Sequence, residues 1–226
     1  MLKEYDIIVV GAGHAGNEAA ASAAKMGSSV LLVTMNMETI GQMSCNPAIG
    51  GIAKGQIVRE IDALGGQTGF VTDLSAIQYK LLNQSKGPAM WSPRAQCDRK
   101  MFSNTWRKTL ENIPNVDFWQ DVVQEIIVEK NKVVGVKTSM GVKIKCKAVV
   151  LNSGTFLNGT IHLGEKQFGG GRMGDKAIKG ITAQLETLGF KSGRMKTGTP
   201  ARVDGRSINF SVMEEQPGDE NPGKFY

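Results

Sequence analysis

The sequence is poor in the residues that build disulfide frameworks and metal sites. Its 226 residues include three cysteines, Cys45, Cys97 and Cys146, and two histidines, His14 and His162. An odd number of widely spaced cysteines argues against a disulfide framework and against a zinc site of the CxxC type. Two distant histidines are too few to indicate a metal centre. We therefore expect neither structural disulfides nor a bound metal ion.

Long hydrophobic runs are also missing. No stretch approaches the roughly 18 apolar residues that a membrane-spanning helix needs. The N-terminal sequence MLKEYDIIVVGAG leads directly into a predicted strand, without the basic region or cleavage site of a secretory signal. These absences predict a cytoplasmic protein that does not associate with membranes. With 41% hydrophobic residues and a net charge of +6, the composition is globular, and its basic excess is compatible with an acidic partner.

Glycine, by contrast, is abundant, and its 28 residues cluster in a few loops. The first cluster, GAGHAG at 11–16, lies between a predicted strand at 5–10 and a predicted Ala-rich helix at 17–27, and another strand is predicted at 28–34. This order of strand, glycine turn, helix and strand is typical of the start of a doubly wound sheet. The sequence therefore predicts an α/β fold of the Rossmann-like class.

The glycine turn matches the GxGxxG pattern of dinucleotide-binding sites. Its intervening residues are Ala12, His14 and Ala15. Gly11 permits the tight turn, Gly13 lets the backbone approach a pyrophosphate, and Gly16 lets the helix lie close on the strand. The N–H groups that begin the helix are then free to bind phosphates. Two positions stay open for His14, one against a phosphate and one facing solvent.

The end of the second predicted strand departs from the usual pattern. An acidic residue normally binds the ribose hydroxyls there. Here the chain reads VTMNMET, in which Thr34 and Asn36 are uncharged and Glu38 comes late, so the ribose contact stays open. The β-meander predicted further along, and the apolar strand that ends in SGT, favour FAD over NAD.

Further helices are predicted at 53–64, 98–112 and 176–188, and short strands between 116 and 155. In the first of these helices, one apolar face is shared by Ile57, Ile61 and Leu64. In the second, the apolar residues at four-residue spacing are Phe102, Trp106 and Leu110, which we expect in the core. Asp98 is its predicted N-cap.

The stretch QMSCNPAIGGIAKG at 42–55 has an order of residues that core packing does not require. Asn46 is a suitable N-cap and Pro47 a suitable first helical residue, so a short helix is predicted here. Cys45 would lie at the N-terminus of this helix, where a thiolate is stabilised. Three glycines would let a ligand approach the backbone, and Lys54 would add a positive charge. Alternatively, Cys45 is a small buried hydrophobic residue, as many free cysteines are.

Eight motifs along the chain point to one family. They are GAGHAG, MSCNPAIGGIAKG, REIDALGG, NQSKGPAM, SPRAQCDR, SGTFLNG, GGGRMGD and RMKTGTPAR. Together they resemble the GidA/MnmG family of tRNA uridine modification enzymes, nearly end to end. SCNPAIGG and SKGPA are far more discriminating than the glycine pattern alone.

The resemblance implies a Rossmann-like FAD-binding domain of the disulfide-reductase-like type, with a β-meander insertion and with the C-terminal part of the full enzyme missing. Residues 1–200 would form the incomplete FAD-binding domain, with the meander at about 116–146. Residues 201–226 would form a linker or the start of a second, inserted domain.

An activity is also implied by the resemblance. Family members add a carboxymethylaminomethyl or aminomethyl group at C5 of the tRNA wobble uridine, with FAD, with NADH as reductant and with methylene-tetrahydrofolate as one-carbon donor. They act as homodimers together with the GTPase MnmE. Gly11 to Gly16 would cradle the FAD pyrophosphate, Val123 would meet the adenine through its backbone, and Cys45 would be one of two important cysteines. The KAIKG stretch at 176–180 lacks the Pro/Ser character expected of a polar cofactor contact.

Basic residues in predicted loops are candidates for tRNA contact, because phosphate contacts supply much of the affinity for nucleic acids. These residues are Lys86, Arg94, Lys196 and Arg202, with Lys54 beside the cysteine. A thiolate at Cys45 is a suitable nucleophile or acid/base for chemistry at the uracil ring.

Three other functions stay open. The first is a folate- and FAD-dependent tRNA uracil methyltransferase of the TrmFO type, against which the cysteine segment and SKGPA argue. The second is a non-catalytic RNA-binding module with a vestigial flavin fold, against which the intact glycine turn argues. A simple NAD-linked dehydrogenase is the third, but neither a catalytic His nor a Tyr-Lys pair stands out.

Overall fold

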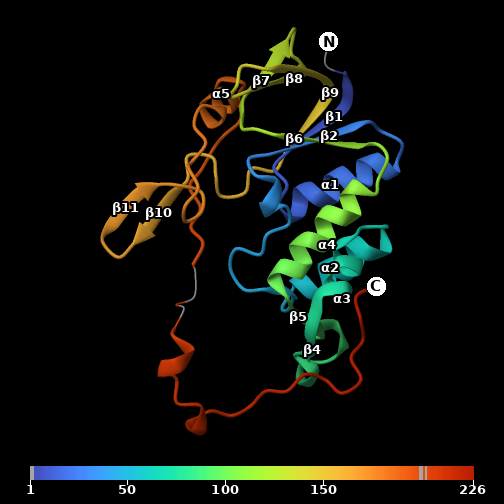
Figure 1. Ribbon diagram of the computed structural model, residues 1–226, viewed down its shortest axis with the longest axis vertical. Coiled ribbons are helices and arrows are strands. Elements are labelled where there is room, and N and C mark those ends of the chain that lie inside the picture. The colour runs from blue at the N-terminus through green and yellow to red at the C-terminus, as the bar shows by residue number, and fades with distance from the viewer. Residues whose placement is uncertain (1–2, 199–200, 202) are drawn as a thin grey trace.

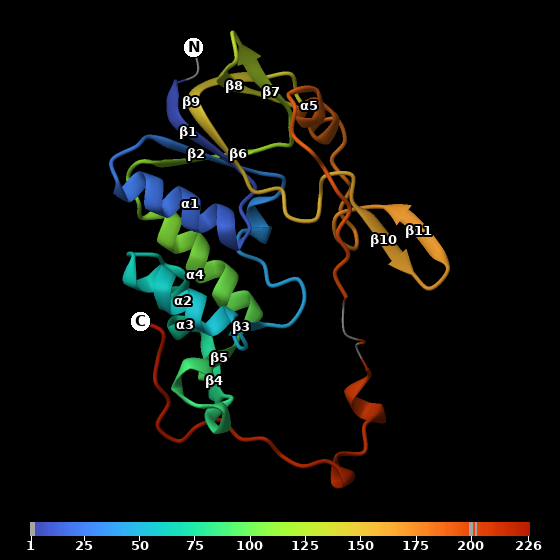
Figure 2. The ribbon, with the colours of Figure 1, turned by 180° about the vertical axis from the view of Figure 1, so that it is seen from behind.

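In the computed structural model, which describes residues 3–198, 201 and 203–226, the chain is built around a six-stranded mixed sheet (Figures 1 and 2). The order of its strands is β6-β2-β1-β9-β8-β7. Their bounds are β1 Tyr5–Val10, β2 Val30–Thr34, β6 Val116–Gln120, β7 Val123–Glu129, β8 Lys132–Thr138 and β9 Lys143–Leu151. β6, β2, β1 and the second half of β9 run parallel, which confirms the predicted Rossmann-like α/β class.

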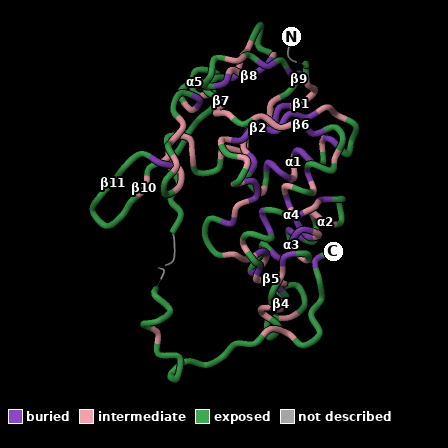
Figure 3. The backbone as a smooth tube through the Cα atoms, in the orientation of Figure 1, coloured by how far each residue is buried: buried purple, intermediate pink, exposed green. Residues whose placement is uncertain are grey.

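Strands β1 and β2 are apolar on both faces because both faces are covered. Ile8 belongs to one buried cluster and Val9 to another, as their side chains alternate across the sheet. Helices α1 (His14–Lys25) and α4 (Arg99–Glu111) pack on one face, and α5 (Ile181–Thr187) packs near β7 on the other. The purple core in Figure 3 follows these central elements.

Helix α4 forms as the sequence predicts. The Asp98 side chain accepts a hydrogen bond from Met101 N at 2.7 Å and so caps the first turn. Phe102, Trp106 and Leu110 are fully buried against α1 and the sheet. Four-residue spacing therefore identified the core-facing stripe of this helix correctly.

The meander is shorter than predicted. Residues 116–120 form β6, which pairs parallel with β2 at the far edge of the sheet, because the α4 crossover returns the chain in the parallel direction. The antiparallel meander is β7-β8-β9 and begins at Val123. Its last strand pairs antiparallel with β8 over 143–145 and then parallel with β1 over 146–151, which joins the meander to the main sheet.

A smaller unit lies below the main sheet in Figure 1. It contains α2 (Lys54–Ala63), α3 (Thr68–Ser75) and an antiparallel sheet of order β3-β5-β4. Its strands are β3 Ala48–Gly50, β4 Ala76–Leu82 and β5 Ser92–Cys97. The short helix predicted at Pro47 is therefore wrong, because β5 pairs with this segment and draws it into a strand.

The buried face of helix α2 is not the apolar face that the sequence spacing predicts. Ile57 is 51% exposed and Leu64 is 89% exposed, whereas Gly55 and Val58 are buried. A Cβ atom at position 55 would lie 2.4 Å from the Pro93 carbonyl oxygen. Close approach of α2 to β5 thus requires glycine at that position, and this contact sets the rotation of the helix.

After β9 the chain forms a projecting hairpin, β10 (Thr160–Leu163) with β11 (Lys166–Gly169). Helix α5 begins at Ile181, five residues later than predicted, because Ile178 bridges to Leu157 and pairs with the loop instead. The segment beyond it is mostly exposed and contains the short 3-10 turns Gly205–Ser207 and Phe210–Val212 (Figure 3).

The C-terminal residues return to the small unit. Phe225 is buried, and the N–H groups of Phe225 and Tyr226 donate to the Asp73 carboxylate at 3.1 and 2.8 Å. Within the described part of the chain, no helix has the length and apolar character to cross a membrane.

Candidate dinucleotide-binding site

The glycine turn connects β1 to α1 at the carboxyl edge of the parallel strands. Gly11 has φ +101°, a conformation that favours glycine, and its N–H donates to the Val33 carbonyl at 2.8 Å. A Cβ atom at Gly11 would lie 2.3 Å from Asn152 O, and one at Gly16 would lie 1.7 Å from Gly11 O. These two glycines are therefore required by the fold itself, where α1, β1 and the end of β9 meet.

Gly13 differs from both of them. Its φ of −77° suits any residue, and a Cβ atom built there would meet no described atom within 4 Å. It is the N-cap of α1, and among the described residues no side chain caps this end of the helix. The turn thus presents unpaired N–H groups and the positive end of the helix dipole on an open side. Such a cradle fits a pyrophosphate, and a side chain at position 13 would partly fill it.

A cleft of about 470 Å³ opens at the same edge of the sheet, between the end of β2 and the start of β7. Met35, Val122, Gln124, Ser139 and residues 174–179 line it. The Val123 side chain is buried in the core, while its two neighbours in sequence face the cleft. The stretch that was expected to begin a helix at residue 176 is therefore part of the wall of this cleft.

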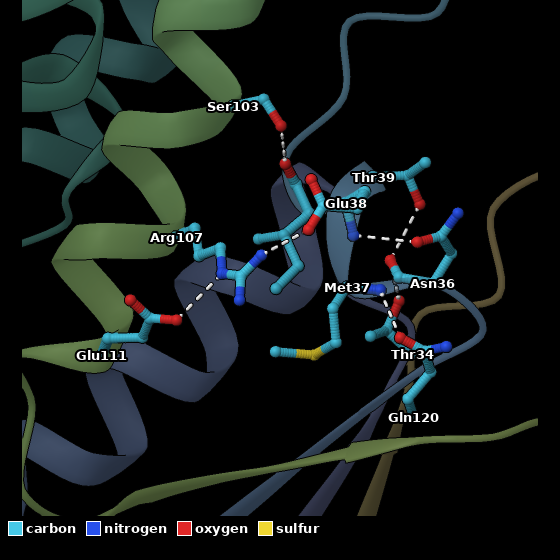
Figure 4. A network of polar contacts seen from close by, with 10 residues as sticks. Thr34, Asn36, Met37, Glu38, Thr39, Ser103, Arg107, Glu111 and Gln120 are labelled. Atoms are coloured by element: carbon cyan, nitrogen blue, oxygen red, sulfur yellow. Dashed lines mark hydrogen bonds and ion pairs between the residues drawn. The ribbon is translucent and has the colours of Figure 1, made fainter.

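The polar residues that follow β2 are engaged in a local network, shown in Figure 4. Glu38 accepts from Arg107 of α4 at 2.8 Å, and Arg107 also donates to Glu111 at 2.9 Å. The Asn36 side chain accepts from Glu38 N at 2.9 Å, and the Thr34 hydroxyl donates to the Asn36 carbonyl at 3.3 Å. Glu38 consequently faces α4 rather than the cleft, so it does not replace the missing acidic residue at the end of β2.

His14 packs under the neighbouring loop and is partly buried. Its Nε2 lies 3.2 Å from the Gly41 carbonyl oxygen, and its ring makes an edge contact with Phe102 at a centroid distance of 5.4 Å. Burial lowers the pKa of the imidazole, and the positive charge of Lys54 acts in the same direction. A neutral ring at pH 7 lets Nε2 donate to Gly41 while the backbone of the turn stays available.

Cys45 is exposed, in an irregular loop before β3. No helix begins behind it, so the predicted stabilisation of a thiolate by a helix N-terminus is wrong. Its carbonyl accepts from Arg99 at 2.7 Å, and the adjacent Ser44 hydroxyl accepts from Arg172 at 3.2 Å. Arg172 also pairs with Asp175 at 2.7 Å, so the Gly-rich loop of residues 164–175 is tied to the cysteine loop.

The glycines that follow Cys45 serve packing more than ligand approach. A Cβ atom at Gly50 would lie 2.1 Å from Pro93 O, the same atom that Gly55 approaches, whereas one at Gly51 would meet only Arg94 Cδ, at 3.8 Å. Two of the three glycines are thus explained by contact with β5. Cys97 and Cys146 are buried, and burial raises the pKa of both thiols.

The predicted substrate-binding cations are not gathered in one place. Lys54 begins α2, near His14, while Lys86 lies in the loop beyond β4. Arg94 lies in β5 and lines a second cleft of about 430 Å³ with Arg59 and Lys80. Lys196 lies in the exposed segment after α5.

Arg202 lies outside the described residues. The contacts of Arg172 and Asn152 were not anticipated from the sequence, because both depend on pairing between distant loops. Among the described residues, no cluster of His, Cys, Asp and Glu side chains could hold a metal ion.

The parallel sheet, the meander and the glycine turn define an α/β domain of the Rossmann-like FAD-binding class. Residues 6–226 match the model of the family described as Glucose inhibited division protein A (GidA), and the chain belongs to this family.

Individual relatives, including one of known structure, are consistent with membership of this family. The tRNA uridine 5-carboxymethylaminomethyl modification enzyme MnmG of Cytophaga hutchinsonii is 69% identical over 225 residues, which are 100% of this chain and 36% of that protein. MnmG of Flavobacterium johnsoniae is 64% identical over 224 residues, or 99% of this chain and 36% of that protein. GidA of Aquifex aeolicus superposes with a TM-score of 0.94 at 52% identity, covering 98% of this chain and 37% of that one. The chain therefore spans little more than a third of the length of these relatives.

Proposed function

We propose that the chain is the FAD-binding portion of an enzyme that modifies C5 of the wobble uridine of tRNA. The name of its relatives, which states tRNA uridine modification, supports the substrate class. The observation that carries the proposal is the open cradle at Gly13, set in a chain that matches MnmG proteins over almost its whole length. In the alternative non-catalytic module, nothing would require the turn to be kept open for a ligand.

The FAD pyrophosphate would be held by the backbone of residues 11–16. Gly13 leaves the approach open, and the N–H groups at the start of α1 supply donors and partial positive charge. Val123 and its neighbours would bound the adenine at the mouth of the 470 Å³ cleft. When bound, the flavin supplies hydride-transfer chemistry that side chains cannot perform.

Cys45 is the proposed catalytic residue, as a nucleophile or an acid/base toward the uracil ring. The support for this role is its exposure, together with the two arginines that hold its loop through Ser44 and the Cys45 carbonyl. In a protein with the full length of the relatives, Cys45→Ser should abolish tRNA modification while leaving FAD binding unchanged. Full activity of the serine variant would refute the role.

The remaining cofactors and partners are proposed from the family resemblance. NADH would reduce the flavin, methylene-tetrahydrofolate would provide the carbon, and a homodimer would act with MnmE on tRNA in the cytoplasm. Lys54, Lys86, Arg94 and Lys196 would contact tRNA phosphates, and Arg202 is proposed with them from the sequence alone. Because these cations are dispersed over the surface, each should contribute a separate contact.

The first test is a titration of the purified chain with FAD, followed by visible absorption and flavin fluorescence. Saturable binding that is lost in Gly13→Asp would support the flavin site at this turn, because the new carboxylate would lie in the phosphate cradle. Equal binding by Gly13→Asp would refute the location of the site. Lack of saturable binding by the unmodified chain would refute the flavin function for this chain.

A further inference from the structure

One buried polar side chain beside the glycine turn has no role in apolar packing. Asn17 lies in the first turns of α1 and is 0% exposed. The other buried positions further along the same helix are small and apolar, namely Ala20, Ala21 and Ala24. Asparagine is a weak helix former, and a buried amide costs free energy unless it is hydrogen-bonded. Its presence at this position calls for a specific partner.

The partners of Asn17 are two carbonyls of the turn. The Asn17 amide is assigned with its nitrogen toward the turn, because only hydrogen-bond acceptors face that side of the group. In this orientation Nδ2 donates to Ala12 O at 3.2 Å and to Gly13 O at 3.3 Å. The Gly13 carbonyl also accepts from Asn17 N at 2.9 Å, and the Ala12 carbonyl accepts from Gly41 N at 2.9 Å. Each carbonyl is thus held toward the protein interior by two donors.

Holding these carbonyls inward directs the adjacent N–H groups outward. In a trans peptide unit the C=O and N–H bonds point in opposite directions, and no described peptide bond is cis. An inward Ala12 carbonyl therefore turns the Gly13 N–H outward, and an inward Gly13 carbonyl turns the His14 N–H outward. These two N–H groups belong to the turn that Gly13 leaves open.

We propose that Asn17 is a positioning residue that fixes the two peptide units of the glycine turn whose N–H groups bind the pyrophosphate of the dinucleotide. The inference rests on the proposed FAD function and deepens it. Asn17 itself does not touch the ligand. It holds the donors in their binding orientation before the ligand arrives, which spares the free energy of ordering them on binding.

The test compares FAD dissociation constants and thermal midpoints of the unmodified chain with those of three variants. Asn17→Ala removes the donor to both carbonyls and should weaken FAD binding about tenfold, because the free energy of ordering the turn is then paid on binding. Asn17→Ser should recover part of this loss, because a helical serine hydroxyl reaches the carbonyl four residues back, which here is Gly13.

Glu18→Gln is the matched control in the same helix. The Glu18 carboxylate accepts from Gln67 N at 2.9 Å and from Thr68 N at 2.5 Å, so its loss should weaken the start of α3 without touching the turn. We expect this variant to lower the thermal midpoint and to leave FAD affinity, measured well below that midpoint, unchanged.

The outcomes separate the two hypotheses. If the unmodified chain binds FAD and Asn17→Ala binds equally well, the positioning role is refuted while the flavin function stands. Affinity losses that follow the midpoint shifts in both the Asn17 and Glu18 variants would indicate a merely structural role and would also refute it. If the unmodified chain does not bind FAD, both the positioning role and the flavin function are refuted.

Discussion

Gly16 and Gly13 of the first turn should respond differently to the same added methyl group. Gly16→Ala would place Cβ 1.7 Å from the Gly11 carbonyl oxygen, which is backbone and cannot rotate away. Separating α1 from β1 should lower the free energy of unfolding by about 3 kcal/mol or more. For a chain of this size each kcal/mol corresponds to about 2–4 °C, so the thermal midpoint should fall by about 6–12 °C.

Gly13→Ala should leave the fold almost unchanged. No described atom lies within 4 Å of the new methyl group, and the φ of −77° is open to alanine. Alanine is a poorer N-cap than glycine by up to about 1 kcal/mol. The smaller conformational entropy of its unfolded state returns about 0.4–1 kcal/mol. The two effects offset each other, so the midpoint should move by less than about 4 °C.

Although Gly13→Ala should keep its stability, it should lose FAD affinity. A methyl group on the open side keeps the phosphate away from the backbone N–H groups, and each charge-assisted hydrogen bond contributes about 1.5–3 kcal/mol. Loss of two such bonds predicts an affinity at least about 100-fold lower. Circular dichroism melting and flavin fluorescence titration measure the two quantities. A Gly13→Ala variant that binds FAD normally, or that unfolds as early as Gly16→Ala, would refute this assignment of roles.

Three further predictions concern the core, the titration of the turn and the C-terminal segment. Trp106→Ala should lower the free energy of unfolding by about 3–5 kcal/mol in urea denaturation, and a loss below about 1 kcal/mol would contradict its place in the core. Because the folded pKa of His14 lies below its ordinary value of 6.5, stability should be lost as the pH falls below about 6.5. In His14→Gln this loss should be absent, and the exposed His162, present in both proteins, cancels in the comparison. Asp73→Ala removes the acceptor of the Phe225 N–H and should speed proteolytic cleavage of the C-terminal segment, whereas an unchanged cleavage rate would show that Asp73 does not anchor it.

Local patterns were sufficient where neighbouring residues decide the structure. The strand before Gly11, the glycine turn and α4 with its Asp98 cap all follow from short-range spacing, capping and backbone preference. The family resemblance likewise depends on motifs that are read directly from the sequence, and the match over residues 6–226 confirms it.

Local patterns misled where a distant segment competes for the same residues. Asn46 and Pro47 have the composition of a helix start, but β5 offers a hydrogen-bonding partner and the segment becomes β3. The apolar stripe of α2 is turned outward because Gly55 must lie against Pro93. In both cases a backbone contact made across about 40 residues outweighs a preference worth about 1 kcal/mol or less per residue.

The sequence by itself determined the class of fold, the family and the position of the glycine turn, because these depend on residues that are close together in the chain. Only the tertiary structure showed which glycine of the turn has open space beside it, that Glu38 is paired with Arg107, and that the buried Asn17 amide lies within hydrogen-bond distance of two carbonyls of the turn. Each of these depends on where side chains from other elements arrive. The packing of α1, β9 and α4 around the turn places those side chains, and short-range sequence preferences carry no information about it.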